Sequence, residues 1–206
     1  MTKTLTTNLF GLIIGIFLLA AVSCGNANND SNSQDSTASS AGVNSDSIAG
    51  DNASAMKAHA DIAATKADTA GSGTATFTKK DDGTIELQLQ VSFPAMANKS
   101  VAVHLHEHGD CSDEGKGAHG HWNPTKEAHG KWGTSAYHSG DIGNVSLDNK
   151  GAGSITLSSN RWTIGGDEKT NILNRSVIVH SGVDDYTSQP SGNAGSRIGC
   201  GLIAAN

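Results

Sequence analysis

Apolar and polar residues alternate most regularly between Thr84 and Phe93, where large apolar side chains occupy every second position. A period of two residues is that of a β-strand, so this segment predicts a strand with one buried face and one solvated face. The turn-forming residues Asp81 to Gly83 come directly before it, and Thr74 to Thr78 precede the turn as a partner strand. We therefore expect an antiparallel hairpin over residues 74–93.

Short strand signals recur along the chain from about Met56 onwards. The further expected strands are Ser100 to Glu107, Asn144 to Leu147, Ser154 to Ser158, Ser176 to His180 and Ile198 to Ile203. Turn-sized and loop-sized joins between about eight short strands predict an all-β antiparallel sandwich or flattened barrel. The alanine-rich residues 53–60 also allow a short helix, but we favour the beginning of a first strand.

Histidines gather between Val101 and Asp141. His104 and His106 are two residues apart on a predicted strand, so both rings point to the same side of it. After His108 the alternation disappears, and a loop of this length is uncommon in a compact domain unless it has a function. Imidazole and carboxylate groups are ligands that suit zinc and copper, and so many together predict a metal site. The candidate ligands are His104, His106, His121, His129, His138, Asp141 and His180.

Length and charge narrow the classes of function. A chain of 206 residues holds one domain, or one domain with an appendage, and the uneven composition favours the second. The formal net charge of -6 provides no basic face, so we expect no nucleic-acid partner.

The N-terminal segment resembles an export signal. One lysine precedes the apolar run Leu9 to Val22, which is shorter than a comfortable membrane span. The run ends in a sequence similar to a bacterial lipoprotein signal, in which Cys24 receives lipid, although Ala21 stands where leucine is usual. Ordinary secretion with Cys24 as an incidental thiol is the alternative. We expect a signal peptide over 1–23, a disordered tether over 24–55 and a folded domain over 56–206.

The cysteine count agrees with lipidation. The chain has three cysteines, Cys24, Cys111 and Cys200, and an exported protein rarely leaves an odd thiol. If Cys24 carries lipid, the other two are free to pair in an oxidising compartment.

Five segments resemble the copper-zinc superoxide dismutase family. They are HLHEHGDC at 104–111, GHWNP at 120–124, His129, HSGD at 138–141 and GNAGSRIGCG at 192–201. The resemblance covers the chain from about Met56 to Asn206. It implies an eight-stranded antiparallel Greek-key barrel with long metal-binding loops. It also implies an exported, periplasmic or cell-surface enzyme that converts superoxide to oxygen and hydrogen peroxide with copper and zinc.

The resemblance also implies a role for each residue of the cluster. Copper would be held by His104, His106, His121 and His180, and zinc by His121, His129, His138 and Asp141. The shared His121 would be catalytic as a proton donor, and Arg197 would be catalytic by guiding the anion to copper. Asp184 would hydrogen-bond one copper histidine and one zinc histidine, and Cys111 and Cys200 would form a disulfide. Without the resemblance, Arg197 reads as a surface arginine and Asp184 as a turn residue.

Several points stay open at this stage. The segment 181–196 contains no lysine or glutamate, so steering beyond Arg197 would come from Lys126 or Lys131. The partners we expect are superoxide and, through a lipid on Cys24, a membrane, while a homodimer is left open. His59, His108 and His119 have no ligand position in the family pattern and are interpreted as surface groups or as neighbours that contact the ligands. The last two are near enough in sequence to the site to take up copper adventitiously. A metal-buffering lipoprotein and a structural β-sandwich module are the alternative functions.

Overall fold

The computed structural model of the chain describes residues 56–206. The expected signal peptide, the tether and the lipidated Cys24 lie outside the described residues, and the division of the chain at residue 55 stays a prediction. Within the described part, no helix is long and apolar enough to span a bilayer.

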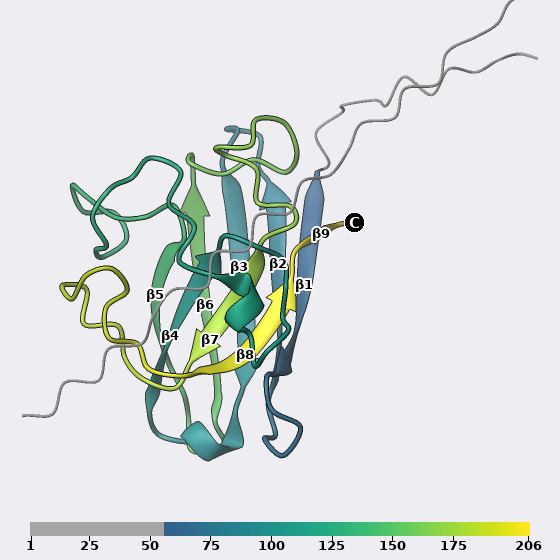
Figure 1. The fold of residues 1–206 in the computed structure, drawn as a ribbon. Helices are drawn as coiled ribbons and strands as arrows, with labels where there is room; N and C mark the ends of the chain where they lie inside the picture. The colour runs from purple at the N-terminus through teal and green to yellow at the C-terminus, as the bar shows by residue number, and fades with distance from the viewer. Residues whose placement is uncertain (1–55) are drawn as a thin grey trace, which may run out of the picture. The chain divides into compact units, whose positions relative to one another are not determined.

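The described residues form an antiparallel β-barrel (Figure 1). Its strands are β1 Lys57–Ala64, β2 Ser72–Lys79, β3 Ile85–Ser92, β4 Ser100–His106, β5 Asp141–Ser146, β6 Ala152–Ser159, β7 Ser176–His180, β8 Arg197–Leu202 and β9 Ala204–Ala205. Two short 3-10 helices, η1 Pro94–Met96 and η2 Lys116–Ala118, lie in the connections. Eight strands follow in the order β5-β4-β7-β8-β1-β2-β3-β6, and the short β9 pairs with β1. The predicted all-β, eight-stranded Greek-key class is therefore confirmed, because β3 pairs with β6 and β4 with β7 across long connections.

The predicted hairpin is confirmed and supplies much of the core. Strands β2 and β3 pair from Ser72 opposite Ser92 to Lys79 opposite Ile85. The turn between them is closed by Asp82, whose carboxylate accepts a hydrogen bond from the Thr84 backbone N–H at 2.9 Å. The apolar positions of β3 are buried, as the period-two alternation requires.

Other predicted strands shift by a few residues. β1 begins at Lys57, so the alanine-rich segment is a strand there and not a helix. β5 begins at Asp141, three residues before the alternation becomes visible, and the last predicted strand corresponds to β8. The short β9 follows it and was not predicted. Residues 160–175 showed no strand signal, yet they place Trp162, Ile164 and Ile172 in the core. The indole ring of Trp162 packs edge to face on Phe77, with ring centroids 5.9 Å apart.

Strand β4 is buried on both faces, and this burial positions the functional residues. Val101, Val103 and Leu105 point into the barrel core. The alternate residues, which include His104 and His106, face outward but are covered by the loops 107–140 and 181–196. The strand pairing shifts between Val103 and His104 on β4, and again between Val179 and His180 on β7. Such irregularities re-aim side chains next to functional sites.

Candidate metal centre

Seven buried residues form two adjoining groups of metal-ligating side chains. His104 and His106 come from β4, His180 ends β7, Asp141 opens β5, and the other three histidines come from the loop between β4 and β5. Within each group, one ligand atom from every residue lies within 4.8 Å of the others. The first group is His104, His106, His121 and His180, and the second is His121, His129, His138 and Asp141. The structure thus brings together all seven candidate ligands.

The first group consists of imidazole nitrogens that face one another. His106 Nε2 lies 3.4 Å from His180 Nε2. His104 Nδ1 and His121 Nε2 are buried and have no hydrogen-bond partner. Buried polar atoms are normally hydrogen-bonded, so unpartnered nitrogens at this position fit a metal ion. Four imidazoles are a donor set that copper accepts.

The second group surrounds one carboxylate. Asp141 Oδ1 lies 2.9 Å from His121 Nδ1 and 3.2 Å from His138 Nδ1, and Oδ2 lies 3.1 Å from His129 Nδ1. The Nδ1 atoms of His129 and His138 approach the carboxylate without hydrogen-bond geometry and have no other partner. Three nitrogens and one carboxylate oxygen at such distances fit a four-coordinate zinc site.

The second ring nitrogen of most of these histidines is held by an acceptor outside the groups. Asp184 lies 2.8 Å from His104 Nε2 through Oδ2 and 2.8 Å from His129 Nε2 through Oδ1. Backbone carbonyls hold the rest: His119 with His106 at 2.9 Å, Glu127 with His138 at 3.1 Å, and Gly195 with His180 at 3.3 Å. Acceptors of this kind fix the tautomer and the ring orientation of a ligand.

His121 differs from the other histidines because neither of its nitrogens has such an outer acceptor. Its Nδ1 faces Asp141 in the second group, and its unpartnered Nε2 belongs with the first group. One ring therefore contributes to both groups.

Burial controls the protonation of the first group. It lowers the pKa of His104 and, more strongly, that of His106. It also lowers the pKa of His121 to about 4 and that of His180 to about 3. These imidazoles are neutral at pH 7, so their lone pairs are available to a metal without displacing a proton.

The pKa shifts in the second group differ from those in the first because a carboxylate lies among its histidines. Burial alone would lower the pKa of His129, but its close contacts with the carboxylates of Asp141 and Asp184 outweigh burial and raise this pKa to about 9. Contacts with His121 and His129 hold the pKa of Asp141 well below its usual range, against the opposing effect of burial. Contacts with His104 and His129 likewise lower the pKa of Asp184. A metal at this position would displace the His129 proton, so its binding is coupled to proton release.

Comparison with known proteins decides the family. Residues 71–203 match the family model of copper/zinc superoxide dismutase (SODC). The chain belongs to this family. It is an enzyme, a superoxide dismutase, and its cofactors are copper and zinc.

The regions that align with two relatives include the barrel of this chain and most of the length of each relative. Superoxide dismutase [Cu-Zn] 1 of Aquifex aeolicus (strain VF5) is 34% identical over 152 residues, which span 72% of this chain and 88% of that protein. Superoxide dismutase [Cu-Zn] 2 of the same organism is 32% identical over 152 residues, with 72% and 86% coverage. Among solved structures, the clock protein EA4 superimposes with a TM-score of 0.64 and 30% identity, covering 74% of this chain and 96% of that one.

Arg197 of the dismutase lies in the cleft beside the first histidine group. It is the first residue of β8, and its guanidinium donates hydrogen bonds to the backbone carbonyls of Gly115 and His119. The cleft has a volume of ≈ 630 Å³, and its lining includes His106, His121 and His180. Arg197 is therefore a half-buried, fixed cation at the mouth of the histidine group and not a freely moving surface arginine.

Other charges line the same cleft. Lys126 is among its lining residues, as are the carboxylates Glu107 and Glu127. Lys131 is not, and its ammonium lies over the ring of Tyr186, 5.8 Å from the centroid. The two carboxylates offset the charge of Lys126, so Arg197 is the cation of this cleft that fixed contacts hold beside the histidines.

The disulfide implied by the resemblance is present in the dismutase. Cys111 and Cys200 are bonded, with Cα atoms 5.7 Å apart and a sequence separation of 89. The bond ties the loop after β4 to β8, the strand that carries Arg197.

Backbone groups of the site had no signal in the sequence. The carbonyls of His119, Glu127 and Gly195 orient three ligands, and any residue type supplies a carbonyl. Gly192 is a partial exception, because it belongs to the motif at 192–201. It has φ +66, and a Cβ there would lie 1.9 Å from Asp184 Oδ1 and 2.6 Å from His129 Nε2. A side chain at this position would disrupt the contact that holds both metal groups.

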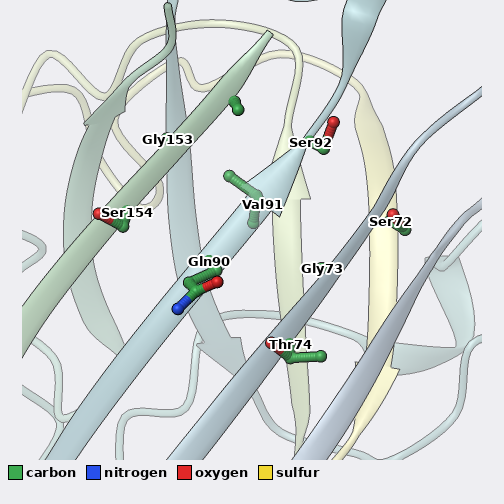
Figure 2. A pocket seen from close by; sticks show the side chains of 9 residues that line it. Ser72, Gly73, Thr74, Gln90, Val91, Ser92, Gly153 and Ser154 are labelled. Carbon is green, nitrogen blue, oxygen red and sulfur yellow. The ribbon is translucent and has the colours of Figure 1, made fainter.

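A second hollow lies on strands β2, β3 and β6, and none of the seven candidate ligands lines it (Figure 2). It has a volume of ≈ 590 Å³ and is lined by Ser72, Gly73, Thr74, Gln90, Val91, Ser92, Ala152, Gly153 and Ser154. It arises where Val91 pairs with two residues that lack side chains, Gly73 and Gly153. None of its lining residues is ionisable, so it offers nothing for metal chemistry or redox catalysis.

Proposed function

We propose that His104, His106, His121 and His180 hold copper and that His121, His129, His138 and Asp141 hold zinc. His121 is thus shared by the two ions, and the enzyme removes superoxide outside the cytoplasm. The observation that carries this proposal is the position of the His121 ring, whose two nitrogens serve different ligand groups.

We assign a different role to each group of residues in the site. Copper, when bound, supplies two oxidation states that accept an electron from one superoxide and return it to another, whereas zinc is not redox-active. The reaction consumes two superoxide ions and two protons and gives oxygen and hydrogen peroxide, and we assign the delivery of one proton to His121 Nε2. Asp184 keeps the His104 and His129 rings oriented, and Arg197 attracts the anion into the cleft.

A superoxide assay on metal-loaded protein tests the proposed function. Protein that contains one copper and one zinc per chain is expected to remove superoxide catalytically, and protein loaded with zinc alone is expected to be inactive. A metal-buffering protein would bind both ions and show no turnover with either loading.

Arg197→Ala is expected to lower the rate at low ionic strength by about tenfold and to make the rate less dependent on salt. The substitution removes the fixed cation of the cleft. The measurement is the rate of superoxide removal as a function of ionic strength. Lys150→Ala is the matched control, because it removes the same charge from the exposed turn between β5 and β6. An Arg197→Ala protein that is as fast as the control at low salt would contradict the assignment.

The location of the enzyme is part of the proposal. Two relatives are named extracellular superoxide dismutases, one of Drosophila melanogaster and one of Caenorhabditis elegans. The Cys111–Cys200 disulfide supports export, because such bonds persist in oxidising compartments. We propose a signal peptide over 1–23, a tether over 24–55 and a folded domain over 56–206, with a lipid on Cys24 as membrane anchor and a homodimer as one arrangement to test. Mass spectrometry of the mature N-terminus distinguishes the anchor from ordinary secretion with a free thiol.

A further inference from the structure

Three further side chains with metal-binding groups meet at the protein surface. Glu107, His108 and His119 are exposed, and each offers one ligand atom within 4.8 Å of those of the other two. The rings of His108 and His119 lie edge to face, with centroids 4.5 Å apart and an interplanar angle of 84°. Neither histidine belongs to the two buried groups, and we call these three residues the outer cluster.

The outer cluster is assembled by backbone pairing between two segments. Glu107 and His108 directly follow β4, and their N–H groups donate to the carbonyls of Gly120 at 3.0 Å and Ala118 at 3.2 Å. This pairing places His119 beside them, although 11 positions separate it from His108. The nearby Cys111–Cys200 bond fastens the same loop to β8. The three side chains therefore project from a backbone that is already ordered.

The backbone of His119 is held on its inner side. Its φ of 61 and ψ of -140 form a conformation that glycine adopts readily and that other residues rarely adopt. Its carbonyl accepts hydrogen bonds from His106 and from Arg197. While the carbonyl faces the main centre, the imidazole faces solvent beside His108. A preformed arrangement of this kind lowers the ordering cost of binding a ligand.

The surrounding charges favour a cation. Hydrogen bonds from Ser112 lower the pKa of Asp110, so this carboxylate close to both histidines is ionised at pH 7. Within residues 56–206, Glu107 makes no ion pair through its carboxylate. The guanidinium of Arg175 donates to three backbone carbonyls, including that of Glu107, and packs on the Trp122 ring at 4.2 Å. Arg175 is therefore engaged elsewhere, and the Glu107 carboxylate is available.

We propose that Glu107, His108 and His119 form a third metal site that binds a divalent transition metal, Cu²⁺ more tightly than Zn²⁺. Two imidazoles and one carboxylate are donors that both ions accept, and sites of nitrogen and oxygen donors favour Cu²⁺. The three protein ligands leave coordination positions to water, so the ion exchanges with solvent. This site is distinct from the buried pair and does not depend on dismutation.

Copper titration of the full chain with both buried sites already filled tests the proposal. Metal analysis first establishes one copper and one zinc per chain, and CuCl₂ is then added in equilibrium dialysis. We expect one further Cu²⁺ per chain, with an electron paramagnetic resonance signal that shows two nitrogen donors. An excess of Zn²⁺ over Cu²⁺ should be required to displace it.

Three variants locate the ion. His108→Gln and His119→Gly are expected to lose the additional Cu²⁺, and Glu107→Gln to bind it at least several-fold more weakly. Glycine suits the His119 backbone and keeps its carbonyl. His59→Gln is the matched control, because it removes one histidine from β1 and should retain the additional ion. Retention of the buried copper and zinc shows that each variant is folded.

The proposal is wrong if the filled protein takes up no further Cu²⁺, or if the further ion persists in His108→Gln. If His119→Gly also loses a buried metal, that variant is not informative, and the result for His108→Gln tests the proposal. The titration measures the number of copper ions bound per chain and not the enzyme's activity. Failure to bind a further Cu²⁺ therefore does not contradict the dismutase proposal, and absence of superoxide turnover does not contradict the outer site.

Discussion

Replacing His121 by alanine is expected to lower the rate of superoxide removal by about a hundredfold or more, the usual range for loss of a positioned proton donor. The substitution removes the ring that belongs to both ligand groups, together with the Nε2 atom to which we assign the delivery of a proton. The visible and electron paramagnetic resonance spectra of copper should change as well, because one nitrogen donor is lost. The assay is carried out with excess copper and zinc so that weaker metal binding does not account for the result.

The control for this substitution is His59→Ala. His59 lies on β1, outside both ligand groups, so its replacement removes a histidine without affecting either ion. A His121→Ala protein with unchanged turnover and an unchanged copper spectrum would contradict the sharing of His121. An altered spectrum with full turnover would retain the ligand assignment and exclude His121 as the required proton donor.

Replacing Cys111 and Cys200 together by alanine is expected to lower the free energy of unfolding by roughly 4 to 5 kcal/mol. The bond closes a loop of 89 residues in the unfolded chain, and its removal restores the conformational freedom of that loop. The change corresponds to a factor of roughly 10³ in the unfolding equilibrium constant. Urea denaturation of metal-free protein is the measurement, because bound metal adds stability of its own.

The double replacement also tests whether the disulfide stabilises the fold as a whole or only holds the loop after β4 in place. Cys200 is buried with Ala118 and Ile178 in a small cluster, and alanine loses little apolar volume there. The variant and the wild-type protein should have the same strands, while in the variant the loop that carries Gly115 and His119 loses its covalent link to β8. A variant whose free energy of unfolding is within about 1 kcal/mol of the wild-type value would show that the unfolded chain gains little from the open loop.

Strands were predictable from the sequence where one face is buried and the other is exposed to solvent. The alternation from Thr84 to Phe93 gave β3 and its partner β2, because period-two burial is a local property of the sequence. β5 was shortened in the prediction, since its first three residues are all buried and show no alternation. Trp162 was missed for a related reason: it enters the core from a segment with no regular period.

The candidate ligands were also predictable, in identity more than in arrangement. His104 and His106 share one side of β4 by strand geometry alone, and the density of histidines around them indicated the other five candidates. The family resemblance supplied the division of the seven between copper and zinc, together with the disulfide. The resemblance implied Asp184 as one of the acceptors that orient the ligands, but the backbone carbonyls were not predictable. The carbonyl of His119 acts on His106 and Arg197 through backbone geometry, and its residue type has no part in that contact.

By itself the sequence determined the β class, the hairpin of β2 and β3, and which side chains were available to bind metals. The family resemblance implied that His121 is shared and that Asp184 connects two of the histidines, and the tertiary structure shows the contacts that both residues make. Only the tertiary structure decided that His108 meets His119 at the surface. The physical reason is the sequence distance over which each kind of interaction acts. Alternation and turn chemistry act over a few neighbouring residues, whereas these contacts join positions 11 to 80 residues apart through strand pairing and loop closure.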